Sequence, residues 1–358
     1  MDNRISKLQA LLDDKKCSAI LISSPINIEH LTGFSNFSKY EREAYLFITK
    51  LNALLFTDAR YIEAVEKIIP KEIKASTKDP VEEIGKIIKR QQIQKIGFEK
   101  NLTFAEYKEF KSEIEANFTL LDNVIEDLRS IKTLEEIEKI KKAARLTDKT
   151  FSYIIKKIKL GVSEKEIAWE IEKFIKENGG TLAFDTIAAF GANSSIPHHL
   201  TSNKKLTNSD QFILLDFGAK VHGYCSDMTR TILTKNAGIK AKKMYQTVFQ
   251  AQENAAKSII SGKKNNAANA AKTANNTLIK AGFEIIPHGL GHGIGLEVHE
   301  TPHLHPKSED ILTSGDYFSI EPGIYIPKFG GVRIEDDYLI TKNKVEQITK
   351  SPKNLIEI

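Results

Sequence analysis

The chain has 358 residues, a length that suits two domains at roughly 100–200 residues each. Its hydrophobic fraction of 41% and charged fraction of 28% are ordinary for globular proteins and exclude the disordered and fibrous classes. The net charge of +5 comes from lysines spread among glutamates, without an arginine-rich arm, so we expect no nucleic-acid partner. Two distant cysteines, an N-terminus unlike a signal peptide and apolar runs far short of the ~20 residues of a membrane span favour a cytoplasmic protein with no membrane partner.

Residues 1–128 are predicted to form a smaller α/β domain. An amphipathic helix pattern over 5–16 precedes three short apolar runs between residues 18 and 58 that are typical of buried strands. Helix patterns that alternate with strand patterns indicate an α/β domain. Because this part contains a single histidine, His30, and no tight cluster of acids with histidines, we expect the chemistry in the rest of the chain.

Residues 129–358 are predicted to form a second, α+β domain. Capping-box patterns, T-x-x-E at 133–136 and S-x-x-E at 163–166, mark the starts of two helices. The first helix should end before Gly161 and the second at Gly179-Gly180. Helices outside a largely antiparallel sheet are the expected architecture. The other helix patterns cover Lys240–Ser261 and Asn266–Lys280, and strand-like segments stand at 211–217, 224–233, 317–320 and 332–340.

Histidines and strand carboxylates gather in this second domain. Eight of the nine histidines lie between His198 and His305. An ionised carboxylate within an apolar strand needs a cation, a hydrogen-bond donor or a proton, because burial of its charge is otherwise very unfavourable. Four carboxylates stand in such surroundings, namely Asp216, Asp227, Glu321 and Glu335.

A hairpin would bring the first two of these carboxylates together. If Val221 and His222 centre the turn, Asp216 lies directly opposite Asp227, and directly opposed residues of an antiparallel pair share a face. A bulge would shift this register.

The second pair is spaced in the same way. Glu321 and Glu335 are equidistant from Lys328, and Gly330-Gly331 are available for the turn. Four converging carboxylates would repel one another, and two divalent cations would neutralise them. His292, flanked by glycines, offers a fifth ligand. One imidazole with four carboxylates favours Mn²⁺ or a similar first-row ion, with Co²⁺, Zn²⁺ or Fe²⁺ as alternatives.

Each of these pieces also has a purely structural interpretation. A single strand aspartate is commonly a hydrogen-bonded structural residue, and a single histidine is commonly satisfied by its neighbours. The GHGIG string around His292 is neither a Walker motif nor G-x-G-x-x-G. The ordered combination of two aspartates, one histidine and two glutamates, each in a strand-like context, favours the metal site.

Five motifs stand in order along the chain, namely SSIPHH (194–199), LLDFGAKVHGYCSDMTRT (214–231), HGLGHGIGLEVHE (288–300), SIEPGIY (319–325) and GGVRIEDD (330–337). Together they resemble the prolidase/aminopeptidase P family, whose C-terminal domain has the pita-bread fold. The resemblance covers nearly the whole chain and is strongest over 126–358, while the N-terminal part is similar to the creatinase-type domain of compact bacterial members.

The resemblance implies a role for each motif residue. His198 would contact the substrate and help proton movement, His299 would stabilise the tetrahedral intermediate, and Glu321 would move the proton of the attacking water. His288 and Arg333 would belong to the substrate site, where Arg333 also supports a metal-binding carboxylate. The implied metal ligands are Asp216, Asp227, His292, Glu321 and Glu335.

The implied activity is metal-dependent hydrolysis of Xaa-Pro bonds in short proline-containing peptides, carried out by a homodimer with a hydroxide activated between two divalent cations. The motifs do not separate a prolidase, which splits dipeptides, from an aminopeptidase P, which removes one residue from a longer peptide. A methionine aminopeptidase shares the ligands but usually lacks this N-terminal domain and the GVRIEDD string. A catalytically inactive pita-bread binding module is the alternative from another class, and such modules tend to lose ligands that are all present here.

One position departs from the family pattern. The family usually has glycine after the Pro-His pair, where this chain has His199. We expect this bulky side chain to narrow the pocket or alter the loop, and so to affect the preferred substrate size. His303 and His305 are expected in a surface loop.

Overall fold

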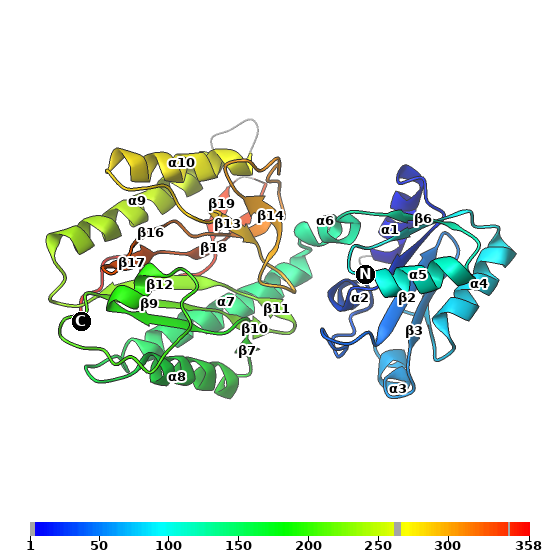
Figure 1. Cartoon of the computed structure of the whole chain (residues 1–358), viewed down its shortest axis with the longest axis horizontal. Helices are drawn as coiled ribbons and strands as arrows, with labels where there is room; N and C mark the ends of the chain where they lie inside the picture. Colours follow the sequence, from blue (N-terminus) through cyan, green and yellow to red (C-terminus); the bar gives the residue numbers. More distant parts are fainter. Residues whose placement is uncertain (1–3, 261–265, 343) are drawn as a thin grey trace. The chain divides into compact units, whose positions relative to one another are not determined.

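The computed structural model describes residues 4–260, 266–342 and 344–358, and Ser261, the last residue of the predicted helix 240–261, lies outside them. The chain divides into two compact units, Met1–Arg129 and Ser130–Ile358 (Figure 1). Cys17 and Cys225 are buried and are not joined in a disulfide. Within the described ranges, the helices lack the combination of length and apolar character needed to cross a membrane.

The N-terminal unit is built on a mixed six-stranded sheet with the order β4-β3-β2-β1-β5-β6. β1 pairs with β5 in parallel and with β2 antiparallel. The predicted first helix and the three predicted strands are confirmed as α1 and β1 to β3. The strands are β1 (Ala19–Ile22), β2 (Ala44–Thr49), β3 (Ala53–Thr57), β4 (Ile73–Ser76), β5 (Lys95–Phe98) and β6 (Asn117–Leu120), and the helices are α1 (Arg4–Asp14), α2 (Pro25–Thr32), α3 (Ile62–Glu66), α4 (Pro80–Gln91), α5 (Phe104–Glu113) and α6 (Val124–Ser130).

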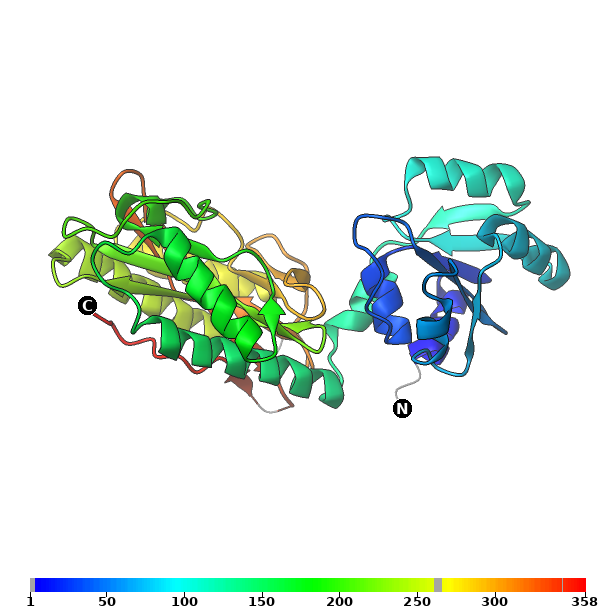
Figure 2. The ribbon, with the colours of Figure 1, turned by 90° about the horizontal axis from the view of Figure 1, so that it is seen from below.

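Helices cover both faces of this sheet, as Figure 2 shows. Ile20 and Ile22 of β1 pack with residues of α1 and α2 in one apolar cluster, whereas Ala19 and Leu21 pack with residues of α4 and α5 in another. Because successive side chains of a strand point to opposite faces, a strand covered on both faces must be apolar throughout. This requirement explains the unbroken apolar run of β1 and the predicted α/β architecture.

The long helices of the C-terminal unit come in pairs. Both predicted capping boxes, at 133–136 and 163–166, are present with their reciprocal hydrogen bonds. The first helix ends at Ile154, before Gly161 as predicted, and Ile155 and Ile158 in the turn that follows it pack against the apolar cluster of the first helix pair. The helices are α7 (Leu134–Ile154), α8 (Glu164–Glu177), α9 (Ile239–Ile260) and α10 (Ala267–Lys280), with a short 3₁₀ turn η1 (Gly191–Ser195).

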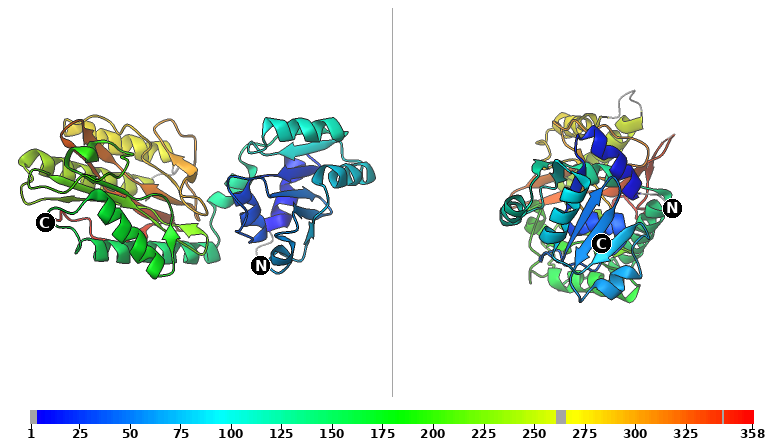
Figure 3. Two further views of the ribbon diagram at one scale, coloured as in Figure 1. Left: turned by 60° about the horizontal axis from the view of Figure 1, so that its bottom comes forward. Right: turned by 90° about the vertical axis from the view of Figure 1, so that its right-hand side faces the viewer.

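Antiparallel sheets lie between the two helix pairs. In Figures 1 and 3, α7 and α8 lie along one side of the sheets and α9 and α10 along the other. The named strand pairs of this unit are antiparallel, as predicted, in sheets ordered β12-β9-β8, β11-β10-β7, β14-β13-β15-β18-β19 and β16-β17. The strands are β7 (Thr181–Leu182), β8 (Ile187–Phe190), β9 (Phe212–Phe217), β10 (Ala219–Val221), β11 (Tyr224–Cys225), β12 (Met228–Leu233), β13 (Gly291–Gly293), β14 (Glu300–Leu304), β15 (Tyr317–Ile320), β16 (Gly323–Ile326), β17 (Gly330–Arg333), β18 (Asp336–Ile340) and β19 (Val345–Gln347).

The first predicted hairpin forms with a different register. Its turn lies at His222-Gly223, one position later than predicted, so Asp216 lies opposite Thr229 and its predicted direct pairing with Asp227 is wrong. Both turn residues have positive φ, 50° and 84°, as a two-residue type I′ turn requires, and glycine adopts such a conformation without strain. The turn therefore settles where the sequence supplies a glycine.

The register predicted for the second hairpin is confirmed. Its strands pair symmetrically about Lys328 on both sides of Glu321 and Glu335. The two glycines lie in β17 and not in the turn. A Cβ on Gly331 would come within 2.2 Å of the carbonyl oxygen of Ser194, so the role of glycine here is to let another segment approach the strand closely.

Candidate metal centre

A cavity of about 630 Å³ in the C-terminal unit is lined by every one of the predicted site residues. Phe184, Asp185 and Ile187, which the sequence did not single out, line the same cavity. The structure therefore brings together residues that lie more than a hundred positions apart in the sequence. The predicted residues along its wall are His198, Asp216, Asp227, His288, His292, His299, Glu321, Arg333 and Glu335.

Three of the predicted ligands stand where a strand is interrupted. Asp227 lies between β11 and β12, Glu321 between β15 and β16, and Glu335 between β17 and β18. An interruption of the regular pleat changes the direction of a side chain. These breaks direct three carboxylates into the cavity that Asp216 reaches from β9 and His292 from β13.

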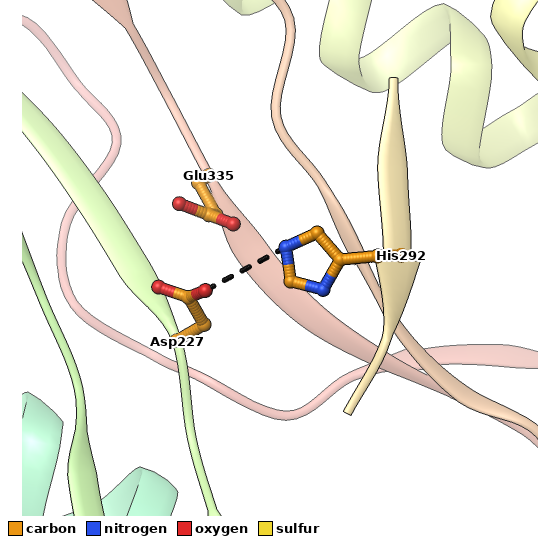
Figure 4. Close-up of side chains that lie close together, drawn as sticks. All are labelled: Asp227, His292 and Glu335. Carbon is orange, nitrogen blue, oxygen red and sulfur yellow. Dashed lines mark ion pairs between the residues drawn. The ribbon is translucent and has the colours of Figure 1, made fainter. Parts of the chain in front are cut away.

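Asp227, His292 and Glu335 form a compact group of possible ligands among the described residues. One ligand atom of each lies within 4.8 Å of the others, and Figure 4 shows the three side chains converging from separate segments. His292 Nε2 is 3.7 Å from Asp227 Oδ2 and 3.3 Å from Glu321 Oε1. An imidazole nitrogen and several carboxylate oxygens thus surround one small volume, which is the donor set of a first-row divalent cation.

The glycines beside His292 allow its strand to fit between two neighbours. A Cβ on Gly291 would lie 2.0 Å from the carbonyl oxygen of Ser319, and a Cβ on Gly293 would lie 2.0 Å from that of Thr301. Any side chain at either position would push β13 away from β15 or β14. The G-H-G spacing therefore serves the backbone approach that places the imidazole in the cavity.

Three of the carboxylates keep a buried oxygen without a hydrogen-bond partner among the residues that the structure describes: Asp216 Oδ1, Asp227 Oδ1 and Glu335 Oε1. The second carboxylate oxygen of Asp216 and that of Glu335 do have donors. Arg333 Nη2 donates to Asp216 Oδ2 at 2.6 Å, and Thr229 Oγ1 donates to Glu335 Oε2 at 2.7 Å. Buried polar atoms are rarely left unpaired. Unpaired oxygens aimed into one cavity fit cation ligands.

The electrostatics of the carboxylates also favour a cation site. Burial, and then the neighbouring charge of Glu335, raise the pKa of Asp227 well above its usual range. Burial and the charge of Glu321 do the same to the pKa of Glu335. Burial would also raise the pKa of Glu321, but its hydrogen bond with His292 brings that pKa below the usual range. In a cation-free site, Asp227 and Glu335 would therefore hold protons, which divalent cations would displace.

Comparison with known proteins identifies the family. Residues 138–342 match the model of metallopeptidase family M24, and residues 4–131 match that of the creatinase/prolidase N-terminal domain. The chain belongs to metallopeptidase family M24. The predicted creatinase-type N-terminal domain followed by a pita-bread domain is thereby confirmed, and membership of this family implies divalent metal ions.

Relatives in this family match along their whole length. The chain is 36% identical to the Xaa-Pro dipeptidase of Pyrococcus horikoshii, over 99% of either sequence. Among solved structures, it is similar to an Xaa-Pro dipeptidase from Bacillus anthracis (TM-score 0.92, 37% identity, 99% of each chain covered). It is also similar to an X-Pro aminopeptidase from Thermotoga maritima (TM-score 0.87, 28% identity, covering 99% of this chain and 100% of that one).

A hydrogen-bonded chain runs from the predicted ligand Asp216 to the cavity wall. Arg333 donates to Asp216 and, through Nη1, to the hydroxyl of Tyr325 at 2.9 Å. That hydroxyl lies 3.0 Å from His288 Nε2, and His288 Nδ1 lies 2.7 Å from the carbonyl oxygen of Gly289. Because the carbonyl oxygen of Gly289 can only accept, Nδ1 of His288 carries the proton. Burial lowers the pKa of His288, so the ring is neutral and its Nε2 accepts from the hydroxyl of Tyr325. Both ring nitrogens of His288 are thus engaged, and its contribution is to shape the wall.

His299 packs edge-on against His292, with ring centroids 4.3 Å apart. Burial, and then the charge of His292, lower the pKa of His299 to about 4. The imidazole is therefore neutral at neutral pH and can donate a hydrogen bond without carrying charge. His198, by contrast, is exposed where it lines the cavity.

The expectations for the other histidines need correction. His199 does not appear among the described residues of the cavity wall, because its ring bonds with the buried Glu164, Nε2 to Oε2 at 2.9 Å. It therefore does not narrow the pocket. His303 is exposed, but it lies on strand β14 and not in a loop, and both His303 and His305 line the cavity. The alternation of β14 directs His303 toward the cavity.

Sequence reasoning missed two residues that support predicted ligands, Thr229 directly and Tyr325 through Arg333. Thr229 bonds with Glu335 and also accepts from Arg333 Nε at 3.0 Å. It follows Asp227 by two positions, a spacing that places it on the same face of a strand and could have indicated it. Tyr325 lies inside a string that was recognised as a motif, yet its sequence position alone gives no sign of its bond to Arg333.

Proposed function

We propose that the chain hydrolyses Xaa-Pro bonds with a pair of divalent cations held by Asp216, Asp227, His292, Glu321 and Glu335. The observation that carries this proposal is the set of buried carboxylate oxygens that lack a partner within the described part of the chain and face one cavity. The names of the Pyrococcus and Bacillus relatives supply the proline specificity. The presence of the complete ligand set argues against an inactive binding module.

Bound divalent cations would supply a water that is deprotonated near neutral pH and would polarise the scissile carbonyl. Glu321, whose pKa is held below its usual range, is ionised and can accept the proton of the attacking water on a carboxylate oxygen. Neutral His299 can donate a hydrogen bond to the oxyanion as it develops. His198, at the exposed side of the cavity, can contact the substrate and carry the proton to the leaving nitrogen.

Proline explains why recognition must rely on shape. Its nitrogen carries no N–H and its φ is fixed, so a peptidase that reads an extended backbone through N–H groups recognises it poorly. Phe184 and Ile187 give the cavity an apolar wall, and His288 is immobilised by its bonds to Tyr325 and Gly289. A rigid, partly apolar wall suits selection of a ring by its form.

We further propose that dipeptides are the preferred substrates. Three relatives named Xaa-Pro dipeptidase share 35–37% identity with this chain, against 28% for the X-Pro aminopeptidase of Thermotoga maritima. The aminopeptidase activity is the second candidate, because that structure also matches along its whole length.

Hydrolysis of Ala-Pro and of Ala-Pro-Ala after loading with Mn²⁺ tests both proposals. Asp216→Asn removes the charge of a proposed ligand, and Asp14→Asn, at an exposed position of the N-terminal unit, serves as the matched control. Cleavage of the dipeptide alone supports a prolidase, and cleavage of the tripeptide supports an aminopeptidase P. Equal inactivity of the wild-type chain and Asp216→Asn on both substrates would reject the peptidase proposal in favour of a binding module.

A further inference from the structure

Glu164, the first residue of α8, is a buried anchor for the segment that carries His198. Its side chain has no exposed surface. It accepts hydrogen bonds from the backbone N–H of Phe190 at 2.8 Å and from Asn193 Nδ2 at 2.8 Å. It also accepts from the backbone N–H and the hydroxyl of Ser202, at 2.9 Å and 2.5 Å. One carboxylate thus ties down both ends of the segment 190–202.

The charge of this anchor is stabilised where it lies. Burial would raise the pKa of Glu164, but the hydrogen bonds from Ser202, Phe190 and His199 bring it below the usual range. The carboxylate also stands in the first turn of α8, where the partial positive charge of a helix N-terminus favours an anion. Glu164 is therefore ionised at neutral pH and is a strong acceptor for any donor placed beside it.

His199 brings this anchor next to His198. Its Nε2 lies 2.9 Å from Glu164 Oε2, and its side chain is only 11% exposed. On the other side of His198, the carbonyl oxygen of Pro197 accepts from Arg333 Nη1 at 3.3 Å. The residues on either side of His198 are therefore both held in place. His199 is bonded to the buried Glu164, and Pro197 is bonded to Arg333, which also donates to Asp216.

We propose that His199 is a positioning residue, whose hydrogen bond to Glu164 sets the direction in which His198 enters the cavity. This inference rests on the proposed function, in which His198 contacts the substrate. Glycine at this position could make no such bond and would give the backbone more freedom. The remaining donors would still satisfy Glu164, so the segment would stay folded while the direction of His198 became less defined. Small displacements of a contacting group reduce rates by up to about 100-fold.

A double-mutant cycle separates positioning from a general effect on the fold. With Mn²⁺-loaded protein and Ala-Pro, we expect His199→Gly to lower kcat/KM by about 10-fold. The same change in a His198→Ala background should alter kcat/KM by less than about 2-fold, because the group that it positions is gone. His199→Gln, which keeps an N–H donor within reach of Glu164, should recover most of the loss. His222→Gly, which removes a histidine outside the cavity wall, is the matched control.

An equal loss from His199→Gly in both backgrounds would overturn the proposal, and so would failure of His199→Gln to recover activity. A second readout needs no activity: the ring NMR signals of His198 in metal-free protein labelled at histidine. His199→Gly should shift the His198 signals and leave those of His30 unchanged. An unmoved His198 signal would contradict the positioning role, whereas a shifted signal in a chain that hydrolyses no Xaa-Pro substrate would uphold positioning and refute the proposed function.

Discussion

Glu99 in the N-terminal unit and Glu335 in the C-terminal unit are both almost completely buried, at 4% and 2% exposed. Their carboxylate oxygens differ in the hydrogen-bond donors that surround them. Glu99 Oε2 accepts from the backbone N–H groups of Ser23 and Ser24, and Oε1 accepts from Asn27 Nδ2 at 2.5 Å. Glu335 keeps one oxygen without a partner among the described residues. Burial alone does not indicate a candidate ligand, whereas a buried carboxylate oxygen without a protein donor does.

The C-terminal unit contains both kinds of carboxylate. Asp336 follows Glu335 directly and is fully buried, but it pairs with Arg230 Nη2 at 2.6 Å and accepts from Thr349 Oγ1 at 2.8 Å. Adjacent residues of one segment thus divide into a satisfied structural acid and a candidate ligand. The difference lies in what the surrounding elements supply, which the sequence pattern E-D-D does not reveal.

The largest expected effect comes from removing the charge of Glu335. Glu335→Gln should lower Xaa-Pro hydrolysis by at least about 1,000-fold, beyond the roughly 10–100-fold that follows loss of a residue that only orients a ligand. The same change should stabilise the metal-free protein against urea at neutral pH. In the folded state Glu335 must either take up a proton or face the charge of Glu321 while buried, whereas glutamine carries no charge in either state. Glu309→Gln, at an exposed position, is the control for both measurements. A metal-free Glu335→Gln protein less stable than wild type would contradict the repulsion argument.

Glu99 should show the opposite behaviour. Glu99→Ala leaves the N–H groups of Ser23 and Ser24 and the amide of Asn27 without their acceptor, so we expect the free energy of unfolding to fall by about 3 kcal/mol. Urea unfolding measures this loss, and metal content measured on the same samples should stay at the wild-type level. A loss of bound metal in this variant would contradict the distinction between carboxylates satisfied by protein donors, such as Glu99, and carboxylates proposed to bind metal, such as Glu335.

Arg333→Lys is expected to have an intermediate effect. Arg333 reaches Asp216, Thr229 and Tyr325 at once through its planar fork, and a lysine ammonium cannot span the three. We expect a loss of about 10–100-fold in metal affinity and in kcat/KM. Calorimetric metal titration measures the metal affinity, and kinetics at saturating metal measure kcat/KM. Full activity together with wild-type metal affinity would mean that the positive charge at position 333 is enough, without the planar guanidinium.

The smallest expected effect concerns Asp316, whose pKa burial raises to about 6. The folded state binds this proton more tightly than the unfolded state, so wild-type stability falls as pH rises from about 4 to about 6. Asp316→Asn lacks this loss, and its stability relative to wild type should rise by about 2 kcal/mol across that range. Urea unfolding of metal-free protein at pH 4.5 and 7 measures the difference. A relative stability independent of pH would show that Asp316 titrates normally.

Much of the fold and the choice of site residues could be predicted from local patterns. Both capping boxes are local signals, and the register about Lys328 follows from the equal spacing of Glu321 and Glu335. The first hairpin was predicted wrongly because its symmetric spacing was weighed without the preference of Gly223 for a left-handed turn.

The remainder depends on contacts between distant segments. The bond of His199 to Glu164 joins positions 35 apart, and that of Arg333 to Asp216 joins positions 117 apart. No periodicity specifies which donor meets which acceptor across such separations. For this reason the sequence could name His199 as a departure from the family without predicting where its ring lies.

Metal content is the most direct test of the central claim that the unpaired carboxylates hold a pair of cations. Wild type, Glu99→Gln and Asp227→Asn would be loaded with Mn²⁺, dialysed and analysed by mass spectrometry for metal per chain. We predict about two ions per chain for wild type and for Glu99→Gln, and at most about one for Asp227→Asn. Retention of both ions by Asp227→Asn, or of none by wild type, would contradict the account.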